Sequence, residues 1–455
     1  MKQELDFGTA KMLPLIFRMS IPTIAAQFVN LLYGIVDRIF IGHIPEVGTE
    51  ALAGVGICNS VILLVAAFAQ FTGGGASPLT AIELGKGKQE RAEKMLGNGI
   101  CLLVIFGILL MIVVYSFMDP ILRLIGATDV TLPYAHSYLS WYMAGTLFVM
   151  TTIGLNPFLT TEGHPKAAMV SVLIGACINI ALDPLFIFVF GWGVAGAAIA
   201  TVISQAVSSV WILKMLLSKD ALLRVSKESL KPEGATIKKI LALGVSPFVM
   251  SSTESLIGFV MNAGLAAYGD IYVSTLTVMQ SCMTIISTPL QGFTAGASPV
   301  ISYNYGRGNV ERIKEGKRII FTVMASFNFI VTLLIILFPS AFAKIFTDDP
   351  ELIAMVERYA VVFLGGFLIF GLQRACQCMF LSMNQPKISL FIALLRKVFL
   401  LVPLALILPK FFGVTGIYLA ESVADATAAT CCFLIFLNRF PKILDEISGQ
   451  KKISS

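Results

Sequence analysis

The chain has 455 residues, of which 56% are hydrophobic and only 13% are charged. A soluble domain of this length does not need so much apolar surface, and the mean hydropathy of +0.84 also excludes that class. The composition therefore indicates a polytopic membrane protein. We interpret the formal net charge of +6 as topological information and expect no nucleic-acid partner.

Twelve apolar runs follow one another along the chain, and each is long enough to cross a bilayer as a helix. A spanning helix needs about 20 apolar residues, and a segment inside lipid must satisfy its own backbone hydrogen bonds. The first six predicted spans are 14–42, 51–83, 92–117, 131–160, 166–190 and 194–217. The second six are 239–268, 273–305, 314–340, 351–382, 387–410 and 413–437. We therefore predict an all-α polytopic membrane protein with twelve transmembrane helices.

The first and second halves of the chain carry the same motif, about 221 residues apart. Ser77-Pro78 and Gly85-Lys86-Gly87 recur with the same spacing as Ser298-Pro299 and Gly306-Arg307-Gly308. Because each half holds six spans, both halves enter the bilayer in the same orientation. The sequence thus predicts two six-helix bundles related by a parallel internal repeat. In many transporters with such repeats one half moves against the other around a central site.

The charged residues outside the spans indicate the orientation and the domain boundaries. Clusters of Lys and Arg lie on one side of the twelve-span arrangement, at 86–94, 214–239, 307–318 and both termini. The positive-inside rule places that side, with both termini, in the cytoplasm. We expect an N-terminal bundle at 1–217, a cytoplasmic linker at 218–238, a C-terminal bundle at 239–437 and a cytoplasmic tail at 438–455.

Polar side chains of the first half converge at one depth in the bilayer. At 1.5 Å per residue, Asp37, Tyr138, Asp183 and Thr201 lie roughly 8–11 Å below the outer boundary. Asn179 lies one turn deeper, on the same helix face as Asp183. Their oxygens suit a small hard cation, and two neighbouring carboxylates can equally share one proton. We predict a cation site at these five residues.

Simpler interpretations of the same residues stay open. Asp37 can pair with the neighbouring Arg38, and Asp183 can cap a break in the helix before Pro184. Pro22 removes a backbone hydrogen bond inside span one and permits a kink. We expect a change of charge at Asp37 to alter the bend of span one at this proline. A static kink is the alternative.

The second half carries a different set of ionisable residues within its spans, where each is costly to bury. The acids are Glu254, Glu421 and Asp425, and the bases are Arg374, Arg396 and Lys397. Equal numbers of acids and bases favour a static ion-pair network between helices. Glu254 is the exception that we consider a possible second cation site, because its span mirrors the span of Asp37.

Taken together, these motifs resemble the multidrug and toxic compound extrusion (MATE) family, in its bacterial multidrug branch, over essentially the whole chain. The matching features are Pro22, Asp37, the stretch 77–87, its repeat at 298–308, and Asn179-x-x-x-Asp183 before Pro184. The resemblance implies two bundles around a central cavity. It also implies a cation site in the first lobe at the residues matching Asp37, Asn179, Asp183 and Thr201, with Tyr138 close by.

The function implied by the resemblance is a cation-coupled antiporter. It would export organic, mostly cationic amphiphilic drugs and toxins by alternating access, and so confer drug resistance. We expect H+ or Na+ as the coupling ion, no cofactor, no other metal, a monomer, and a place in the bacterial cytoplasmic membrane. The expected substrate cavity between the halves is lined by Gln27, Asn30, Gln70, Met250, Phe259, Gln280, Met283 and Gln291.

Two rival functions come from other classes. A flippase for lipid-linked precursors has a related fold and would use a cationic groove, which Arg374, Arg396 and Lys397 keep open, although twelve spans count against it. An intramembrane enzyme would use Asp37 and Asp183 as an acid pair. The sequence supplies no nucleophile, metal motif or phosphate loop for it, so we expect no enzymatic activity.

Overall fold

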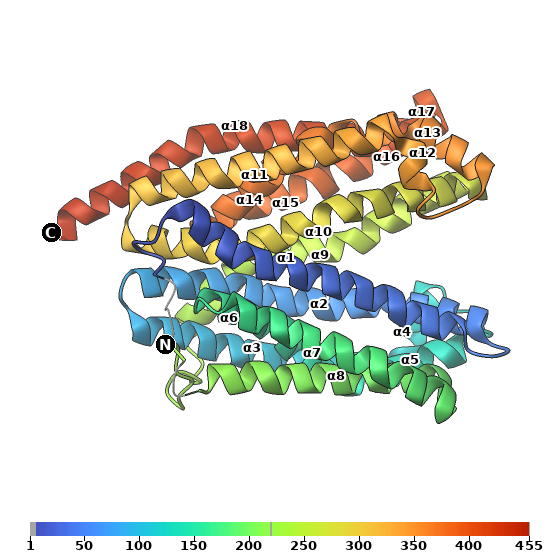
Figure 1. Ribbon diagram of the computed structural model, residues 1–455, viewed down its shortest axis with the longest axis horizontal. Helices are drawn as coiled ribbons and strands as arrows, with labels where there is room; N and C mark the ends of the chain where they lie inside the picture. Colours follow the sequence, from blue (N-terminus) through green and yellow to red (C-terminus); the bar gives the residue numbers. More distant parts are fainter. Residues whose placement is uncertain (1–5, 219–220, 455) are drawn as a thin grey trace. The chain divides into compact units, whose positions relative to one another are not determined.

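The computed structural model describes residues 6–218 and 221–454, and within these ranges it describes only the backbone of residues 254–256, 259 and 450–454. The described chain is helical, with short connections and no strand (Figure 1). The helices of the first half are α1 (Met12–Gly42), α2 (Gly48–Gly85), α3 (Gln89–Ser116), α4 (Met118–Ile125), α5 (Leu132–Ala144), α6 (Thr146–Thr161), α7 (Pro165–Pro184), the π-helical turn η1 (Leu185–Val189) and α8 (Gly193–Leu216).

The second half follows the same order, with three additional short elements. Its helices are α9 (Gly234–Ala266), α10 (Asp270–Arg307), α11 (Val310–Leu337), α12 (Pro339–Ala343), α13 (Pro350–Leu364), η2 (Gly366–Ile369), α14 (Phe370–Ser382), α15 (Pro386–Leu394), η3 (Leu395–Leu401), α16 (Val402–Ile407), α17 (Pro409–Phe412) and α18 (Val414–Ser454). In both halves the fifth predicted span contains a π-helical segment, η1 or η3.

These helices fall on the predicted spans. Among the described residues, nine helices are long and apolar enough to cross a membrane. Two bent pairs add two more: α5 with α6, bent by 59°, and α13 with the segment Gly366–Ser382, bent by 47°. The long helix α9 lies at the position of the seventh predicted span.

Packing divides the described chain into two compact units. Unit 1 contains Arg18–Ser251, and unit 2 contains Asp6–Phe17 together with the chain from Ser252 onward. The start of α1 therefore packs within unit 2, and the first half of α9 packs within unit 1. The boundaries expected at 217 and 239 rest on the sequence repeat and stay a prediction.

Close helix contacts in unit 1 depend on glycine. The Cα of Gly73 on α2 lies so near α6 that a Cβ there would clash with the carbonyl oxygen of Gly154. Small residues let helix backbones approach closely inside a membrane, where helices gain little from the hydrophobic effect. The Gly73-Gly74-Gly75 stretch thus serves helix packing.

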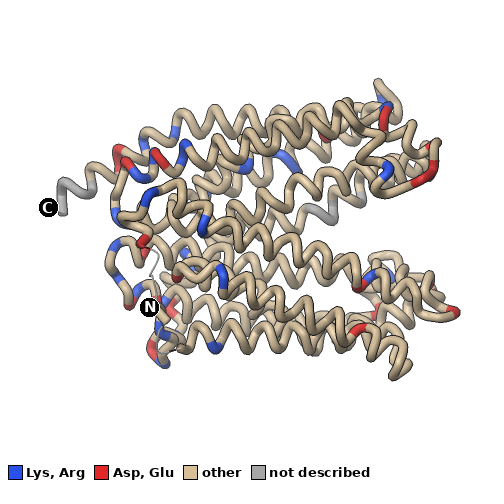
Figure 2. Tube along the Cα trace, viewed as in Figure 1, with Lys and Arg blue, Asp and Glu red and all other residues tan. Residues whose placement is uncertain are grey.

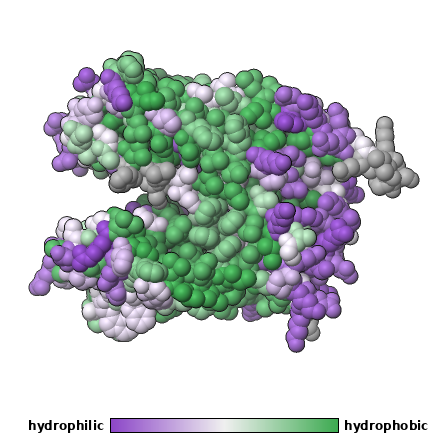
Figure 3. Space-filling model, turned by 180° about the vertical axis from the view of Figure 1, so that it is seen from behind, coloured by the Kyte–Doolittle hydropathy of each residue, from purple (hydrophilic) through white to green (hydrophobic). Residues whose placement is uncertain are grey.

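The surface of each unit separates apolar and charged regions. In each unit the middle of the helices is hydrophobic on the face shown in Figure 3, and the hydrophilic residues gather at the helix ends. Large apolar side chains such as Ile112 on α3 and Leu337 on α11 are exposed. In unit 1, Lys and Arg are concentrated at the end that holds the α2–α3 connection and the segment before α9 (Figure 2). This distribution is that of helices surrounded by lipid.

Candidate cation site

The five residues predicted to form the cation site all lie in unit 1 and are all buried. Asp37 is near the end of α1, Tyr138 is on α5, Asn179 and Asp183 are in the last two turns of α7, and Thr201 is on α8. Asn179 and Asp183 are 0% exposed, and Asp37 is the most accessible of the set at 8%. The five residues predicted from their depth in the bilayer are therefore all buried in one bundle.

Asn179 holds part of the cluster together. Its side-chain Nδ2 donates to Asp183 Oδ1 at 3.1 Å and to Thr201 Oγ1 at 3.3 Å. Both donor hydrogens of the amide are thereby used. Asn179 and Asp183 are thus hydrogen-bonded across one helical turn. Their i, i+4 spacing places the two side chains on the same face of α7.

The cluster has more acceptors than donors. Within the described residues, Asp37 Oδ1, Asn179 Oδ1 and Asp183 Oδ2 are buried and have no hydrogen-bond partner. A buried polar atom without a partner costs about 1–3 kcal/mol, and more when it is charged. Three such oxygens in one bundle favour the uptake of a positively charged species.

The carboxyl groups of Asp37 and Asp183 lie close enough to interact electrostatically with each other. A hydrogen bond between two carboxyl groups requires that one of them carries a proton. Without that proton, the two negative charges need a cation between them. The arrangement can therefore hold either a proton or a small metal cation, and chemistry alone does not separate the two.

Two further tyrosines, which were not predicted from the sequence, belong to the cluster. Tyr33 lies one turn before Asp37 on α1, interacts electrostatically with Asp37 and lies near Thr201. Tyr142 stacks on Tyr138, with ring centroids 6.1 Å apart and planes at 15°. The i, i+4 spacing of Tyr33 to Asp37, and of Tyr142 to Tyr138, was the available signal.

Local backbone structure positions Asp183. Pro184 follows it directly, and since proline has no backbone N–H, the regular α-helical hydrogen bonding is interrupted there. The chain continues as the π-helical turn η1. Such turns inside helices occur frequently at functional sites. The simple alternative, an ion pair of Asp37 with Arg38, is not among the ion pairs of the described residues, and Arg38 is exposed whereas Asp37 is buried.

The second half contains an ion-pair cluster instead of an oxygen cluster. Arg396 on η3 bonds Glu421 on α18, Nη2 to Oε1 at 2.8 Å, and also bonds Asp425 through Nε. The guanidinium lies 4.6 Å from the centroid of the Phe370 ring. This part of the expected static network is present. The side chain of Glu254 lies outside the described residues, so its role stays a prediction.

Residues expected to line the substrate cavity are distributed over both units. Gln27, Asn30, Gln70 and Met250 belong to unit 1, and Gln280, Met283 and Gln291 belong to unit 2. The side chain of Phe259 lies outside the described part of the chain. Pro22 is buried inside α1, as expected for a residue within span one. These assignments remain predictions.

The fold and the buried oxygen cluster define a polytopic membrane transporter. The family model described as MatE matches residues 22–185 and 247–407, one stretch in each half. The chain belongs to the MatE family. It is therefore a transporter and not an enzyme, and the family suggested by the sequence motifs is confirmed.

Curated relatives are similar over nearly their whole length. The multidrug export protein MepA of Staphylococcus haemolyticus is 22% identical over 448 residues, which cover 98% of each chain. MepA of Staphylococcus aureus is 23% identical over 416 residues, which cover 91% of each chain.

Solved structures show the same fold. The crystal structure of MATE in the bent conformation superposes with a TM-score of 0.91 at 24% identity, covering 98% of this chain and 99% of that one. An outward-facing multidrug resistance MATE family transporter of the MOP superfamily gives a TM-score of 0.89 at 24% identity, covering 97% and 99%. The predicted all-α fold of two six-helix bundles is thereby confirmed.

Proposed function

We propose that the protein is a cation-coupled antiporter that exports organic, mostly cationic amphiphilic compounds from the bacterial cytoplasm. The observation that carries this proposal is the cluster at Asp37, Asn179 and Asp183, whose buried acceptor oxygens lack partners in the described chain. The names of the staphylococcal relatives, which are multidrug export proteins, support the class of substrate.

The cluster suits one half of an exchange cycle. When H+ or Na+ enters from outside, it neutralises the Asp37–Asp183 pair and removes the cost of the unpartnered oxygens. Without the cation, the two charged carboxylates make this conformation of unit 1 less stable. Unit 1 therefore rearranges when the cation leaves. Coupling requires that the cation and the drug each favour a different conformation, and the coupling free energy must be reciprocal.

Pro22 is the candidate for transmitting this change. It lies inside α1, fifteen residues before Asp37, so its missing backbone hydrogen bond allows the helix to bend between the site and the other end of the bundle. We propose that bending of α1 alters the cavity residues on the same helix, Gln27 and Asn30. Both termini lie in the cytoplasm and a single chain suffices for transport in this proposal.

Dye efflux from proteoliposomes tests the proposal. Na+ and proton gradients are imposed separately, and export of a fluorescent cationic dye is recorded for the wild type, Asp37→Asn and Asp183→Asn. We expect one gradient to drive export in the wild type and neither to drive it in the two variants. The matched control is Asp129→Asn, an exposed acid paired with Arg123 in the same unit, which should export normally. Export by both site variants at the wild-type rate would contradict the proposal.

A further inference from the structure

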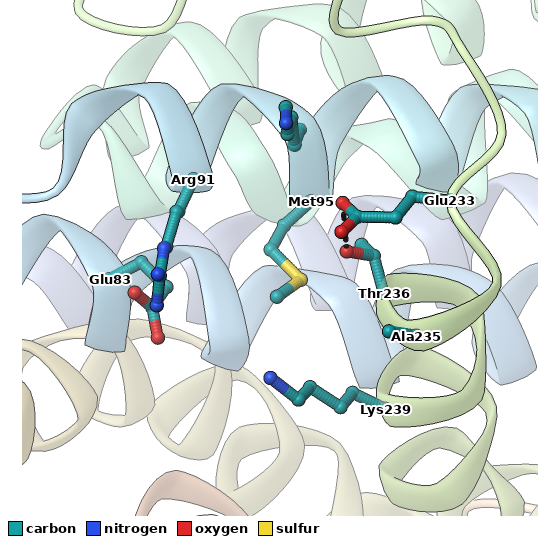
Figure 4. Close-up of a pocket in the computed structure, with 8 residues that line it drawn as sticks. Glu83, Arg91, Met95, Glu233, Ala235, Thr236 and Lys239 are labelled. Carbon is teal, nitrogen blue, oxygen red and sulfur yellow. Dashed lines mark hydrogen bonds between the residues drawn. The ribbon is translucent and has the colours of Figure 1, made fainter.

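A polar cavity lies at the basic end of unit 1, away from the cation site. Its volume is about 280 Å³, and it lies between the end of α2, the start of α3 and the start of α9 (Figure 4). The polar side chains lining it are Glu83, Arg91, Lys94, Glu233, Thr236 and Lys239. Three cations and two carboxylates thus face one small volume.

One of these carboxylates is buried and incompletely bonded. Glu83 is 9% exposed; its Oε1 accepts from Lys86 Nζ at 2.7 Å, while its Oε2 is buried without a partner in the described chain. The side chains of Arg91, Lys94 and Lys239 form no ion pair with any described residue. The cavity therefore offers a buried acceptor that needs a donor, and three exposed cations that can hold an anion.

The internal repeat shows that this cavity is not a necessary product of the fold. Glu83 and Arg91 correspond to Asn304 and Arg312 in the second half, at the same spacing of about 221 residues. In unit 2, Asn304 Nδ2 and Arg312 Nη2 both donate to the backbone carbonyl of Phe7, at 2.9 and 3.0 Å. The chain's own N-terminal segment thus satisfies the matching pair.

In unit 1 only Arg91 of the matching pair could donate to a backbone carbonyl in that way. Glu83 is a carboxylate and has no hydrogen to donate to a carbonyl oxygen, in contrast to Asn304. The segment before α9 is instead bound by Asn98, whose Oδ1 accepts from the backbone N–H of Glu233 at 2.8 Å. Thr236 also donates to Glu233, at 2.8 Å. The wall of the cavity is therefore fixed, and Glu83 and Arg91 are left facing the cavity.

We propose that this cavity binds a phosphoethanolamine group, as carried by the head of an aminophospholipid. The phosphate lies among Arg91, Lys94 and Lys239, and the ammonium donates to Glu83 Oε2. Such a zwitterion satisfies both the cations and the orphaned acceptor through charge-assisted hydrogen bonds. A glycerol phosphate brings no cation for the two carboxylates, and a choline ammonium has no N–H to donate. The location at the charged end of spanning helices is that of lipid headgroups.

The test uses the full-length protein, purified in detergent and depleted of lipid, with bound ligand counted by native mass spectrometry. The probes are dioctanoyl phosphatidylethanolamine, the matching phosphatidylcholine and phosphatidylglycerol, free phosphoethanolamine, and inorganic phosphate. We expect the ethanolamine lipid to bind about tenfold more tightly than the other two lipids, since only its ammonium brings both an N–H donor and a positive charge to Glu83. Displacement by free phosphoethanolamine shows that the headgroup alone is recognised, and failure of it to compete shows that the source is the lipid.

Two variants and one control complete the design. Glu83→Gln should abolish the preference for ethanolamine over glycerol, and Lys239→Gln should weaken binding of all three lipids. Lys239 is exposed, so that variant is expected to fold even if Glu83→Gln does not. The control is Glu90→Gln, an exposed acid in the first turn of α3 that does not line the cavity. Equal binding of the three lipids by the wild type, or an unchanged preference in Glu83→Gln, would overturn the proposal.

Discussion

The carboxyl groups of Asp37 and Asp183 interact with each other inside unit 1, although they come from α1 and α7. No basic side chain forms an ion pair with either of them in the described chain. Two buried carboxyls in this position cannot both stay charged without a counterion. The pair therefore provides a physical reason for the binding of a proton or a metal cation.

Replacing either carboxyl by an amide should uncouple the transporter without unfolding it. In Asp183→Asn the new amide can donate to the Asp37 carboxylate, so the repulsion between two buried carboxylates disappears and the protein keeps or gains thermal stability. Export should fall to the level of empty liposomes, because no cation is needed any longer. Thermal unfolding in detergent, together with dye efflux, checks both parts. A folded variant that still exports with gradient dependence would remove Asp183 from the mechanism.

Truncation of Asn179 should affect both stability and coupling. Asn179→Ala leaves Asp183 and Thr201 without their shared donor, so the free energy of unfolding should fall by about 1–3 kcal/mol. Asn156→Ala is a suitable comparison, because Asn156 donates to Ala168 O and Ser171 Oγ, both at 2.9 Å, at another place in unit 1. We expect similar losses of stability but loss of gradient dependence only at Asn179. Equal transport by the two variants would reduce Asn179 to a packing role.

Much of this site follows from sequence because the helical rise fixes depth. Counting from the ends of the predicted spans places Asp37, Asp183 and Thr201 at one level, and the structure buries all three in one bundle. Depth does not give the rotation of each helix, however, and for that reason Tyr33 was not selected although it lies one turn from Asp37. The contacts of irregular segments could not be predicted from the sequence either. The backbone N–H of Leu223 bonds Glu162, and no periodic pattern connects a linker residue with the end of a distant helix.

That linker contact predicts a pH dependence of stability. Glu162 lies just beyond α6 and accepts from Leu223 N–H at 2.9 Å; burial raises the pKa of its carboxyl to about 7. The folded state thus binds a proton that the unfolded state releases near its ordinary pKa of 4.5. Stability from this group is full below that value and declines as the pH rises to about 7.

Thermal unfolding measured between pH 4.5 and pH 8 checks this dependence. The Glu162→Gln variant keeps an acceptor for Leu223 but does not titrate. It should be more stable than the wild type at the upper end of the range and should lose this part of the pH dependence. Parallel curves for the two proteins would show that Glu162 does not titrate in this range.

Glycine substitutions in α2 should separate packing from helix propensity. Gly73→Ala places a Cβ against the carbonyl oxygen of Gly154 and should cost about 1–3 kcal/mol of stability. Gly56→Ala meets no atom within 4 Å and should leave stability unchanged or raise it by about 0.5–1 kcal/mol. Thermal or denaturant unfolding in detergent measures the change in stability of each variant. A harmless Gly73→Ala would mean that α2 and α6 separate easily at this contact.

The ion pairs of Arg396 should matter for stability more than for ion specificity. Arg396→Leu leaves Glu421 and Asp425 buried without their partner, which should cost about 3–5 kcal/mol. Adding Glu421→Gln and Asp425→Asn should restore part of that loss, because the two unpaired acids are then gone, although the buried Lys397 loses the negative charges beside it. Unfolding of the single and triple variants checks the rescue. If the triple variant folds but no longer exports, the cluster has a role in transport as well.

The most direct test of the central claim is the count of cations released when substrate binds. Tetraphenylphosphonium is added to purified protein in weakly buffered solution, and the released H+ and Na+ are measured in separate experiments. We predict release of one species by the wild type and of neither by Asp37→Asn or Asp183→Asn. Substrate binding with no release of either ion, at an affinity independent of pH and Na+, would contradict the claim that the Asp37–Asp183 pair holds the coupling cation.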